Sequence, residues 1–419
     1  MKKSILILIA LMLIFPISLA FSDGQKVQLT FLEVMTSPDR TAVLHGIIDA
    51  YQAMNPNVTI NLISPPYEQA DNKLTMMLNA KQPLDIVEVR DFTEKQFVQN
   101  KRLENLEPYL SSWEGTKALL PVTLSAARAV DGKAYFLPQF FYIKALFVRT
   151  DMLQKLGVKD MPKTIDELYA VCKQITDPSK NQFGFGFRGK NNAYKISDPL
   201  IISDVANVDP QNTYLTKDGK SVFDNPDFLA ALKKYVDLFN TATPKDAINW
   251  GFNEQVNAFV SGITPFLVQD PDTVPLLDQQ LGREKYSVIP LPLGKSGKVY
   301  LDYGSAGFGI PSYSKNKSEA WKFIAYISSA SVNADFCKKY GTLPITSVAF
   351  NSDPYFNSGV YKAWATTMSD SKHYVFIKYP LASPKMPGWG QIQEQYMQSA
   401  LLGSTSPEDA AQKWAAYWK

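Results

Sequence analysis

Histidine and cysteine supply many catalytic and metal centres, and this chain of 419 residues has only two of each. His45 and His373 stand in no HExxH, GxSxG or Cys-His pattern. Zinc sites and nucleophile–base pairs depend on such groupings. We therefore expect no catalytic residue, no bound metal and no cofactor.

The two cysteines leave their pairing open. Cys172 lies on the apolar stripe of a helix predicted to begin at a capping pair, Thr164 and Glu167. A buried free thiol is the favoured state there, because unpaired cysteines are usually buried. Export would nevertheless permit a disulfide with Cys337.

A long apolar run lies at the N-terminus. Lys2 and Lys3 precede the run from Ile5 to Phe15, and Ser18 to Ala20 supplies small residues for cleavage. The run is too short to span a membrane as a helix. We predict a signal peptide over residues 1–20 and a mature protein that is soluble in the periplasm or outside the cell. No cysteine follows the cleavage site, so no lipid anchor is expected.

An excess of charge of one sign is also missing. The net charge is +3, and loss of the two N-terminal lysines would leave 41 basic and 40 acidic residues. Such a balance gives no electrostatic basis for a polyanion partner, so nucleic acid is not expected.

Predicted strands and helices alternate along the chain, which is typical of α/β domains with largely parallel sheets. About 400 mature residues exceed what a single core usually serves, so we expect two domains. The clearest predicted strands are Val27–Glu33, Val58–Leu62 and Asp85–Val89. Two helices are predicted to begin at the Ser-Pro pairs Ser37-Pro38 and Ser406-Pro407.

The segment from Tyr286 to Ser329 carries the most information. A strand there is interrupted by Pro290 and Pro292, which cannot donate ladder hydrogen bonds, so the strand must leave its sheet. A second strand, Tyr300–Ile310, is rich in glycine and permits close approach of another backbone. Asn316 and Glu319 are predicted to cap a helix that packs through an apolar stripe, Ala320, Phe323, Ile324 and Ile327.

This segment resembles the family 1 extracellular solute-binding proteins, the maltose-binding-like receptors of ABC importers. Four further stretches resemble landmarks of that family in the right order: Asp131–Pro138, Phe147–Glu167, Ala258–Gly262 and Gly341–Pro344. The resemblance covers nearly the whole mature chain.

The resemblance implies a two-lobe α/β periplasmic-binding fold of type II, with three crossings between lobes. The landmarks place the first lobe at 21–138 plus 290–328 and the second at 139–289 plus 329–419. It further implies a receptor that captures a mono- or oligosaccharide between the lobes and delivers it to ABC permease subunits. We expect the receptor to be a monomer.

Candidate ligand residues stand where strands end, because ligands of α/β sheets bind at the carboxyl edges. Charged and amide groups there could bond sugar hydroxyls, and aromatic rings could pack on them. The set from strand ends, crossings and loops is Glu33, Thr36, Arg90, Asp91, Gln139, Phe141, Asn192, Tyr194, Tyr303 and Gly304.

Two further positions rest on the resemblance. Trp389 matches an aromatic that stacks on a sugar face in maltose-binding-like proteins, and flanking Pro387, Gly388 and Gly390 argue against a helical core position. Gln269-Asp270 stands where many relatives have glycine and an aromatic. Carboxylates there could bond adjacent hydroxyls or attract a cationic ligand instead.

Other functions remain open at this point. An exported glycoside-cleaving enzyme would need a carboxylate pair whose separation the sequence does not give. Receptors of the same fold for a polyol, cation or metal are further alternatives, although no Tyr-Tyr pair supports a ferric site. A GxGxxG match in Phe183–Gly189 precedes no helix pattern and therefore predicts no nucleotide site.

Overall fold

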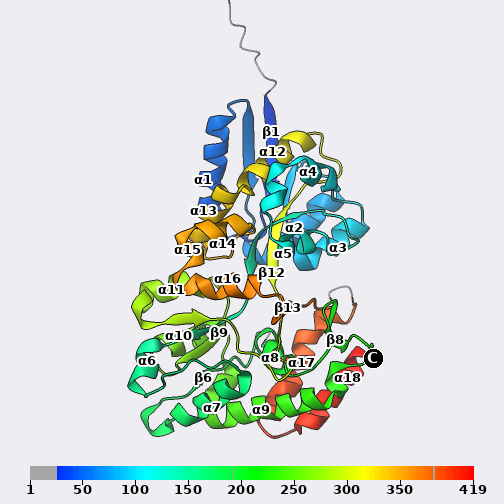
Figure 1. Ribbon diagram of the computed structural model, residues 1–419. Helices are drawn as coiled ribbons and strands as arrows, with labels where there is room; N and C mark the ends of the chain where they lie inside the picture. The colour runs from blue at the N-terminus through cyan, green and yellow to red at the C-terminus, as the bar shows by residue number, and fades with distance from the viewer. Residues whose placement is uncertain (1–25, 192, 381–382) are drawn as a thin grey trace, which may run out of the picture.

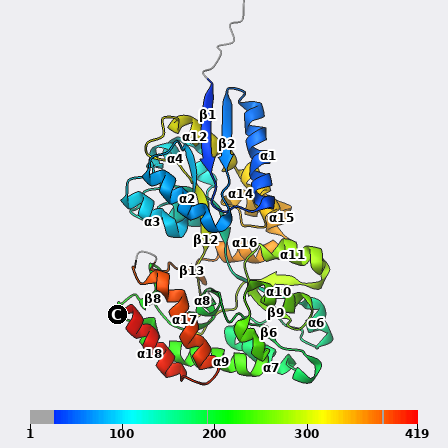
Figure 2. The same cartoon turned by 180° about the vertical axis from the view of Figure 1, so that it is seen from behind.

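The computed structural model describes residues 26–419 except 192 and 381–382. The predicted signal peptide therefore lies outside the described residues. Two β-sheets, each covered by helices, lie at opposite ends of an elongated molecule (Figures 1 and 2). The fold is the predicted two-lobe α/β architecture.

The first sheet has the strand order β2-β1-β3-β12-β4. Strands β2 and β3 are parallel to β1, whereas β12 is antiparallel to both of its neighbours. The strand bounds are Val27–Leu32 (β1), Val58–Ile63 (β2), Ile86–Arg90 (β3), Leu137–Tyr142 (β4) and Gly304–Gly309 (β12).

Alternating strand residues bury both faces of this sheet. The first face packs on α1 and α12, where Phe31 shares a core with Leu44 and Ile324. The second face packs on α2 and α3, where Val89 shares a core with Leu74. The helices of this half are α1 (Pro38–Met54), α2 (Tyr67–Asn79), α3 (Asp91–Gln99), α4 (Glu107–Ser112), α5 (Pro121–Ala127), α12 (Lys317–Ile327) and α13 (Ala330–Tyr340).

The second sheet has the order β10-β5-β9-β6, with bounds Ala145–Val148 (β5), Phe185–Gly186 (β6), Phe266–Gln269 (β9) and Ser287–Ile289 (β10). Its half also holds the hairpin of β7 (Val208–Asp209) and β8 (Asn212–Thr216). The helices are α6 (Thr150–Lys155), α7 (Ile165–Ile175), α8 (Tyr194–Ile202), α9 (Pro226–Ala242), α10 (Phe252–Val260), α11 (Thr273–Gln280), α17 (Met386–Leu401) and α18 (Pro407–Trp418).

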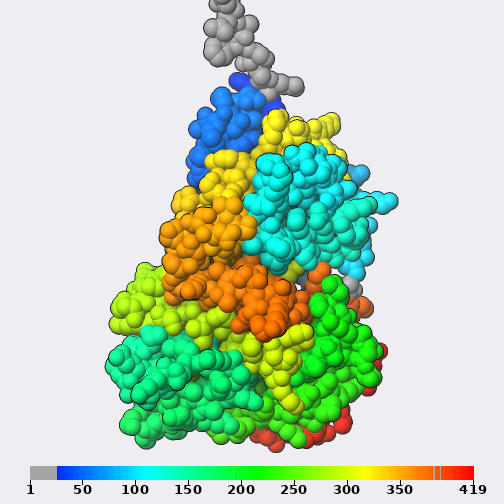
Figure 3. All heavy atoms as spheres, in the orientation of Figure 1, coloured from blue at the N-terminus to red at the C-terminus, as the bar shows by residue number. Residues whose placement is uncertain are grey.

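Three short helices lie where the two halves meet: α14 (Ser347–Ser352), α15 (Pro354–Asn357) and α16 (Lys362–Ser369). They form the orange band across the middle of Figure 3. A parallel pair of short strands, β11 (Val299–Leu301) and β13 (Tyr374–Phe376), lies near the same junction.

The chain passes between the sheets at defined places. Ile143 and Lys144 link β4 to β5, and Asp302 and Tyr303 link β11 to β12. Later in the chain, α13 packs on α1 of the first half, whereas α16 packs on β10 of the second sheet. A third passage between the halves therefore lies between α13 and α16. Sheet membership does not define rigid bodies, and the lobe boundaries at 138/139, 289/290 and 328/329 stay a prediction.

The stretch expected as one strand, Tyr300–Ile310, is two strands. β11 pairs with β13 and β12 enters the first sheet, because the chain changes direction at Asp302 and Tyr303. The expected close approach occurs at Gly307, where a Cβ would collide with the Leu137 carbonyl group. β10 ends at Ile289, directly before the first proline, as predicted.

Gly307→Ala is expected to lower the free energy of unfolding by about 1–3 kcal/mol, because the added methyl group overpacks against backbone. Urea unfolding would measure the loss. Gly46→Ala is the matched control, since Gly46 lies inside α1 with nothing within 4 Å of its Cβ position. The control should gain up to about 1 kcal/mol. Equal effects of the two substitutions would contradict the packing argument.

Most predicted helix starts are confirmed. Ser37 caps α1, Thr164 and Glu167 form the capping box of α7, and Ser406 caps α18. Asn316 is the N-cap residue of α12 as predicted, and the helix buries its predicted stripe, but the side-chain capping bond expected between Asn316 and the first turn is not formed. The Asn316 side chain donates instead to Asp85 and the Gln28 carbonyl, so it ties the helix to the sheet.

Both cysteines are buried and free, which confirms the interpretation of Cys172 as a small apolar side chain. Over residues 26–419, outside the gaps at 192 and 381–382, no helix has the length and apolar character needed to cross a bilayer.

Candidate ligand-binding cleft

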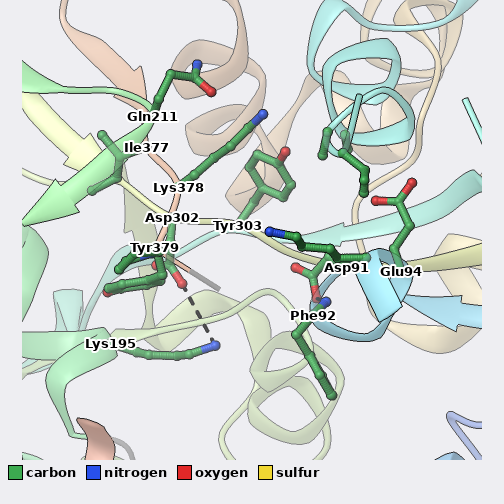
Figure 4. Close-up of a pocket in the computed structure, with 15 residues that line it drawn as sticks. Asp91, Phe92, Glu94, Lys195, Gln211, Asp302, Tyr303, Ile377, Lys378 and Tyr379 are labelled. Atoms are coloured by element: carbon green, nitrogen blue, oxygen red, sulfur yellow. Dashed lines mark hydrogen bonds and ion pairs between the residues drawn. The ribbon is translucent and has the colours of Figure 1, made fainter. Parts of the chain in front are cut away.

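A cavity of about 320 Å³ lies between the two halves of the molecule (Figure 4). Side chains of α3 and the end of α5 form one wall, and side chains of α8 and residues 377–380 form the other. The β11–β12 link contributes Asp302 and Tyr303. The volume is at the lower end of the range for small-molecule sites.

The first wall owes its position to the junction of β3 and α3. All five residues of β3 are buried, and α3 begins at once at Asp91, so the first helical turn lies at the carboxyl edge of the sheet. Burial raises the pKa of Asp91 to about 6, against the opposing effects of Lys195 and the Phe92 amide. Glu94 follows one turn later, and burial and the charge of Asp91 raise its pKa to about 9.

The second wall contains charged side chains in ion pairs and tyrosine side chains that donate hydrogen bonds to a buried carboxyl group. Asp302 is 5% exposed and lies 4.0 Å from the Lys195 ammonium group and 3.6 Å from that of Lys144. Tyr379 donates a hydrogen bond of 3.3 Å to Asp198. Burial raises the pKa of Asp198 to about 8 although it accepts this bond and another from Tyr214.

A second cavity of about 410 Å³ adjoins the first. Gln211, Tyr303 and Lys378 line both cavities and therefore separate them. The second is lined mainly by α5, by the end of α16 and by β13.

The first cavity combines hydrogen-bonding charges with aromatic surface. Carboxyl and ammonium groups can bond to hydroxyl groups with charge assistance, and ring faces can cover C–H surface. Phe92, which is 52% exposed at the cavity, offers such a ring. In the part of the chain that the structure describes, no three His, Cys, Asp or Glu side chains are grouped to hold a metal ion.

Two predicted ligand residues, Asp91 and Tyr303, line the cavity. Gly304 follows Tyr303 as the first residue of β12. Tyr194 lies behind the cavity, with its ring 5.3 Å from that of Tyr379 in an edge-to-face contact. Asn192 lies outside the described residues.

Glu33, Thr36 and Arg90 are not among the residues lining the cavity. Glu33 is fully buried and accepts hydrogen bonds from Arg40 and Thr41. The Arg90 guanidinium group donates hydrogen bonds to the Tyr67 hydroxyl group and to the Val34 carbonyl group. The Thr36 hydroxyl is buried and has no hydrogen-bond partner among the described residues.

The crossing residues also have internal partners. Gln139 is fully buried and donates to the Ser328 hydroxyl at 2.7 Å, and Phe141 is a buried core ring. Gln269 donates to Gln255 at 2.9 Å. Asp270 lies 3.6 Å from the Lys144 ammonium group. All of these partners belong to the protein itself, and any direct ligand contact of these residues stays a prediction.

Trp389 lies in a helix and in the core, although the flanking proline and glycines were expected to keep it out of both. Trp389 lies in α17, whose first turn accepts the proline, and its side chain is 0% exposed. Its indole N–H donates to the Tyr214 hydroxyl, and its ring packs on Trp418 and Phe223. No face of the ring is open to a ligand, so a stacking role has no support.

Several cavity residues were missed by sequence reasoning. Glu94 could have been found, because it lies one helical turn after Asp91, and Asp302 because it precedes Tyr303. Lys195, Lys378 and Tyr379 gave no comparable signal, since they reach the cavity only through the tertiary fold.

Two α/β halves that are linked by three passages and enclose a charged and aromatic cavity define a binding protein for a small ligand. The family model described as bacterial extracellular solute-binding protein matches residues 37–334. The chain belongs to this family.

Relatives in other organisms can be aligned with this chain over most of its length. A Brucella abortus (strain 2308) chain named as a binding protein is 28% identical over 415 residues, 95% of this chain and 94% of that one. The maltotriose-binding protein of Pyrococcus abyssi (strain GE5 / Orsay) is 25% identical, covering 85% of this chain and 74% of that one. The structure of the sugar-binding protein MalE from Xanthomonas citri has a TM-score of 0.78 at 21% identity, over 93% and 95% of the two chains. This last likeness confirms the fold.

Proposed function

We propose that this protein is the receptor of an ABC importer, which encloses a mono- or oligosaccharide between its two halves and delivers it to permease subunits. The observation that carries the proposal is the cavity, which is lined by Asp91, Asp302 and Lys195 together with the aromatic side chains of Phe92 and Tyr303. The maltotriose-binding relative supports a sugar as the ligand class.

Ligand binding would favour the closed arrangement, because only that arrangement brings both walls onto one ligand. The size of this effect is set by the difference between the ligand affinities of the closed and open arrangements. Changing the closed-to-open ratio from 1:99 to 99:1 takes a difference of about 5.5 kcal/mol. The charged and aromatic groups of the two walls are the source of that energy. The passages at Lys144 and Asp302 are the places where the backbone would bend.

The finer features of the proposal come from the sequence. The receptor would lose residues 1–20, act as a soluble monomer in the periplasm or outside the cell, and carry no lipid anchor. It would bind without turnover. Reducing-end release from an oligosaccharide would contradict binding alone.

A thermal-shift panel tests the ligand class. We expect at least one of maltose, maltotriose or D-tagatose to raise the melting temperature, since a ligand at 100 times its Kd stabilises the folded state by about 2.7 kcal/mol. D-mannitol and ribitol in the same panel test for a polyol receptor. Tryptophan fluorescence should change with the same concentration dependence. Spermidine and ferric citrate are the controls for cationic and metal ligands. Stabilisation by a control or by a polyol, with none by any sugar, would overturn the proposal.

A further inference from the structure

The Glu94 side chain makes no hydrogen bond or ion pair with the residues that the structure describes. Its residue is 1% exposed and lines the cavity, and its Oε1 atom has no hydrogen-bond partner among the described residues. No described Lys, Arg or His group lies within ion-pair distance of its carboxyl group, whereas Asp302 on the other wall has two lysines at 3.6–4.0 Å. A buried polar group without a partner is costly, and it persists at sites where a ligand supplies the partner.

The groups around Glu94 oppose a negative charge there. Asp91 on the same helix and Asp131 after α5 are like charges, and Lys378 is the one cation with a recognisable opposing effect. The phenol groups of Tyr303 and Tyr135 also face Glu94. Burial and the two carboxylates outweigh Lys378, which accounts for the raised pKa of about 9.

A neutral carboxyl group differs from a carboxylate because it both donates and accepts a hydrogen bond. The Asp302 carboxylate can only accept hydrogen bonds, so a sugar can bond to it only through a hydroxyl group that donates. Ring and glycosidic oxygens, which only accept, need a donor on the protein. Figure 4 shows Glu94 and Asp91 on one side of the cavity, across from Asp302, Lys195 and Tyr379.

We propose that Glu94 is a specificity-determining ligand residue whose neutral carboxyl group donates a hydrogen bond to an acceptor oxygen of an uncharged sugar. This inference rests on the proposed function and narrows its ligand to uncharged saccharides. An amino sugar could instead pair with a Glu94 carboxylate. Three ammonium groups, those of Lys95, Lys195 and Lys378, line the same cavity and disfavour that cationic ligand.

The first test compares two substitutions, using the sugar of the panel that stabilises the protein most. Glu94→Ala should weaken its binding at pH 7 by tenfold or more, because both hydrogen-bond roles are lost. Glu94→Gln should recover much of that loss, since an amide N–H replaces the acid O–H. Calorimetric titration would measure the affinities. Glu114→Gln changes an exposed glutamate of the same half and should have no effect. Loss in Glu94→Gln as large as in Glu94→Ala would overturn the inference.

A second readout needs no ligand. The pKa of Glu94 is about 9 when folded and has an ordinary value of 4.5, so its contribution to stability is complete below pH 4.5 and is lost as pH rises toward 9. The melting temperature of Glu94→Gln, relative to the natural protein, should therefore rise between pH 4 and pH 9. A constant difference would show an ionised Glu94 and overturn the inference, even if the sugars bind.

The two readouts separate the possible failures. If no sugar binds but the pH dependence appears, the proposed function fails and the sugar contact fails with it, while the protonation state stands. If glucosamine binds more tightly than glucose and Glu94→Gln abolishes this preference, Glu94 is the partner of an amine. That result would overturn the inference and leave the receptor function intact.

Discussion

Replacing Trp389 with alanine is expected to lower the free energy of unfolding by about 3–5 kcal/mol, the range for a buried tryptophan. The ring is completely buried among Tyr214, Phe223, Trp414 and Trp418, so its loss leaves a cavity that α17 and α18 cannot close. The Tyr214 hydroxyl group also loses its indole donor. Urea or thermal unfolding would measure the change.

Leu402→Ala is the matched control for this experiment. Leu402 follows α17 directly and is 68% exposed, so its truncation should change stability by less than about 0.5 kcal/mol. Sugar affinity measured well below the melting temperature should change little in Trp389→Ala. A large loss of affinity with unchanged stability would show that the ring contacts ligand and would contradict the core position.

Arg40→Ala is expected to destabilise the protein by about 3–5 kcal/mol, because it leaves two buried carboxylates without their cation. The Arg40 guanidinium group donates to Glu33 at 2.7 Å and also to Glu88, and all three side chains are 0% exposed. It lies 5.2 Å from the centre of the Tyr340 ring. One side chain thus joins α1, β3 and α13.

Two further variants make this prediction specific. Lys117→Ala removes an exposed partner of Glu114 and should cost less than about 1 kcal/mol. Adding Glu33→Gln and Glu88→Gln to Arg40→Ala should recover part of the loss, since no buried charge then remains unpaired. Equal stability of Arg40→Ala and Lys117→Ala in chemical unfolding would show that the buried cluster contributes no more than a surface pair.

Local sequence signals predicted the elements that depend on local physics. Ser37 and Ser406 cap their helices because a serine oxygen can accept from a backbone amide three residues later. The strand predicted to begin at Val27 is β1, and Pro290 marked the end of β10. Asn316 holds the N-cap position of α12, but its side chain bonds to Asp85, far away in sequence, instead of capping the helix.

The sequence predicted cavity residues only at strand ends that face the cavity. Asp91 and Tyr303 satisfied that rule, and so did Glu33, but Arg40 turns back from the first turn of α1 and holds the Glu33 carboxylate inside. The sequence shows no sign of that return. Nor does the sequence show the core position of Trp389, because the neighbours of its ring come from α18 and from Tyr214 and Phe223.

The position of β12 has a consequence for biosynthesis. It lies between β3 and β4, and β4 has no other strand partner in the first sheet. Residues 304–309 leave the ribosome long after Tyr142, and at about 5–20 residues per second the interval is roughly 10–30 s. Throughout that interval the nascent first sheet has an open gap, so the N-terminal third of the chain cannot complete its fold while it is being made.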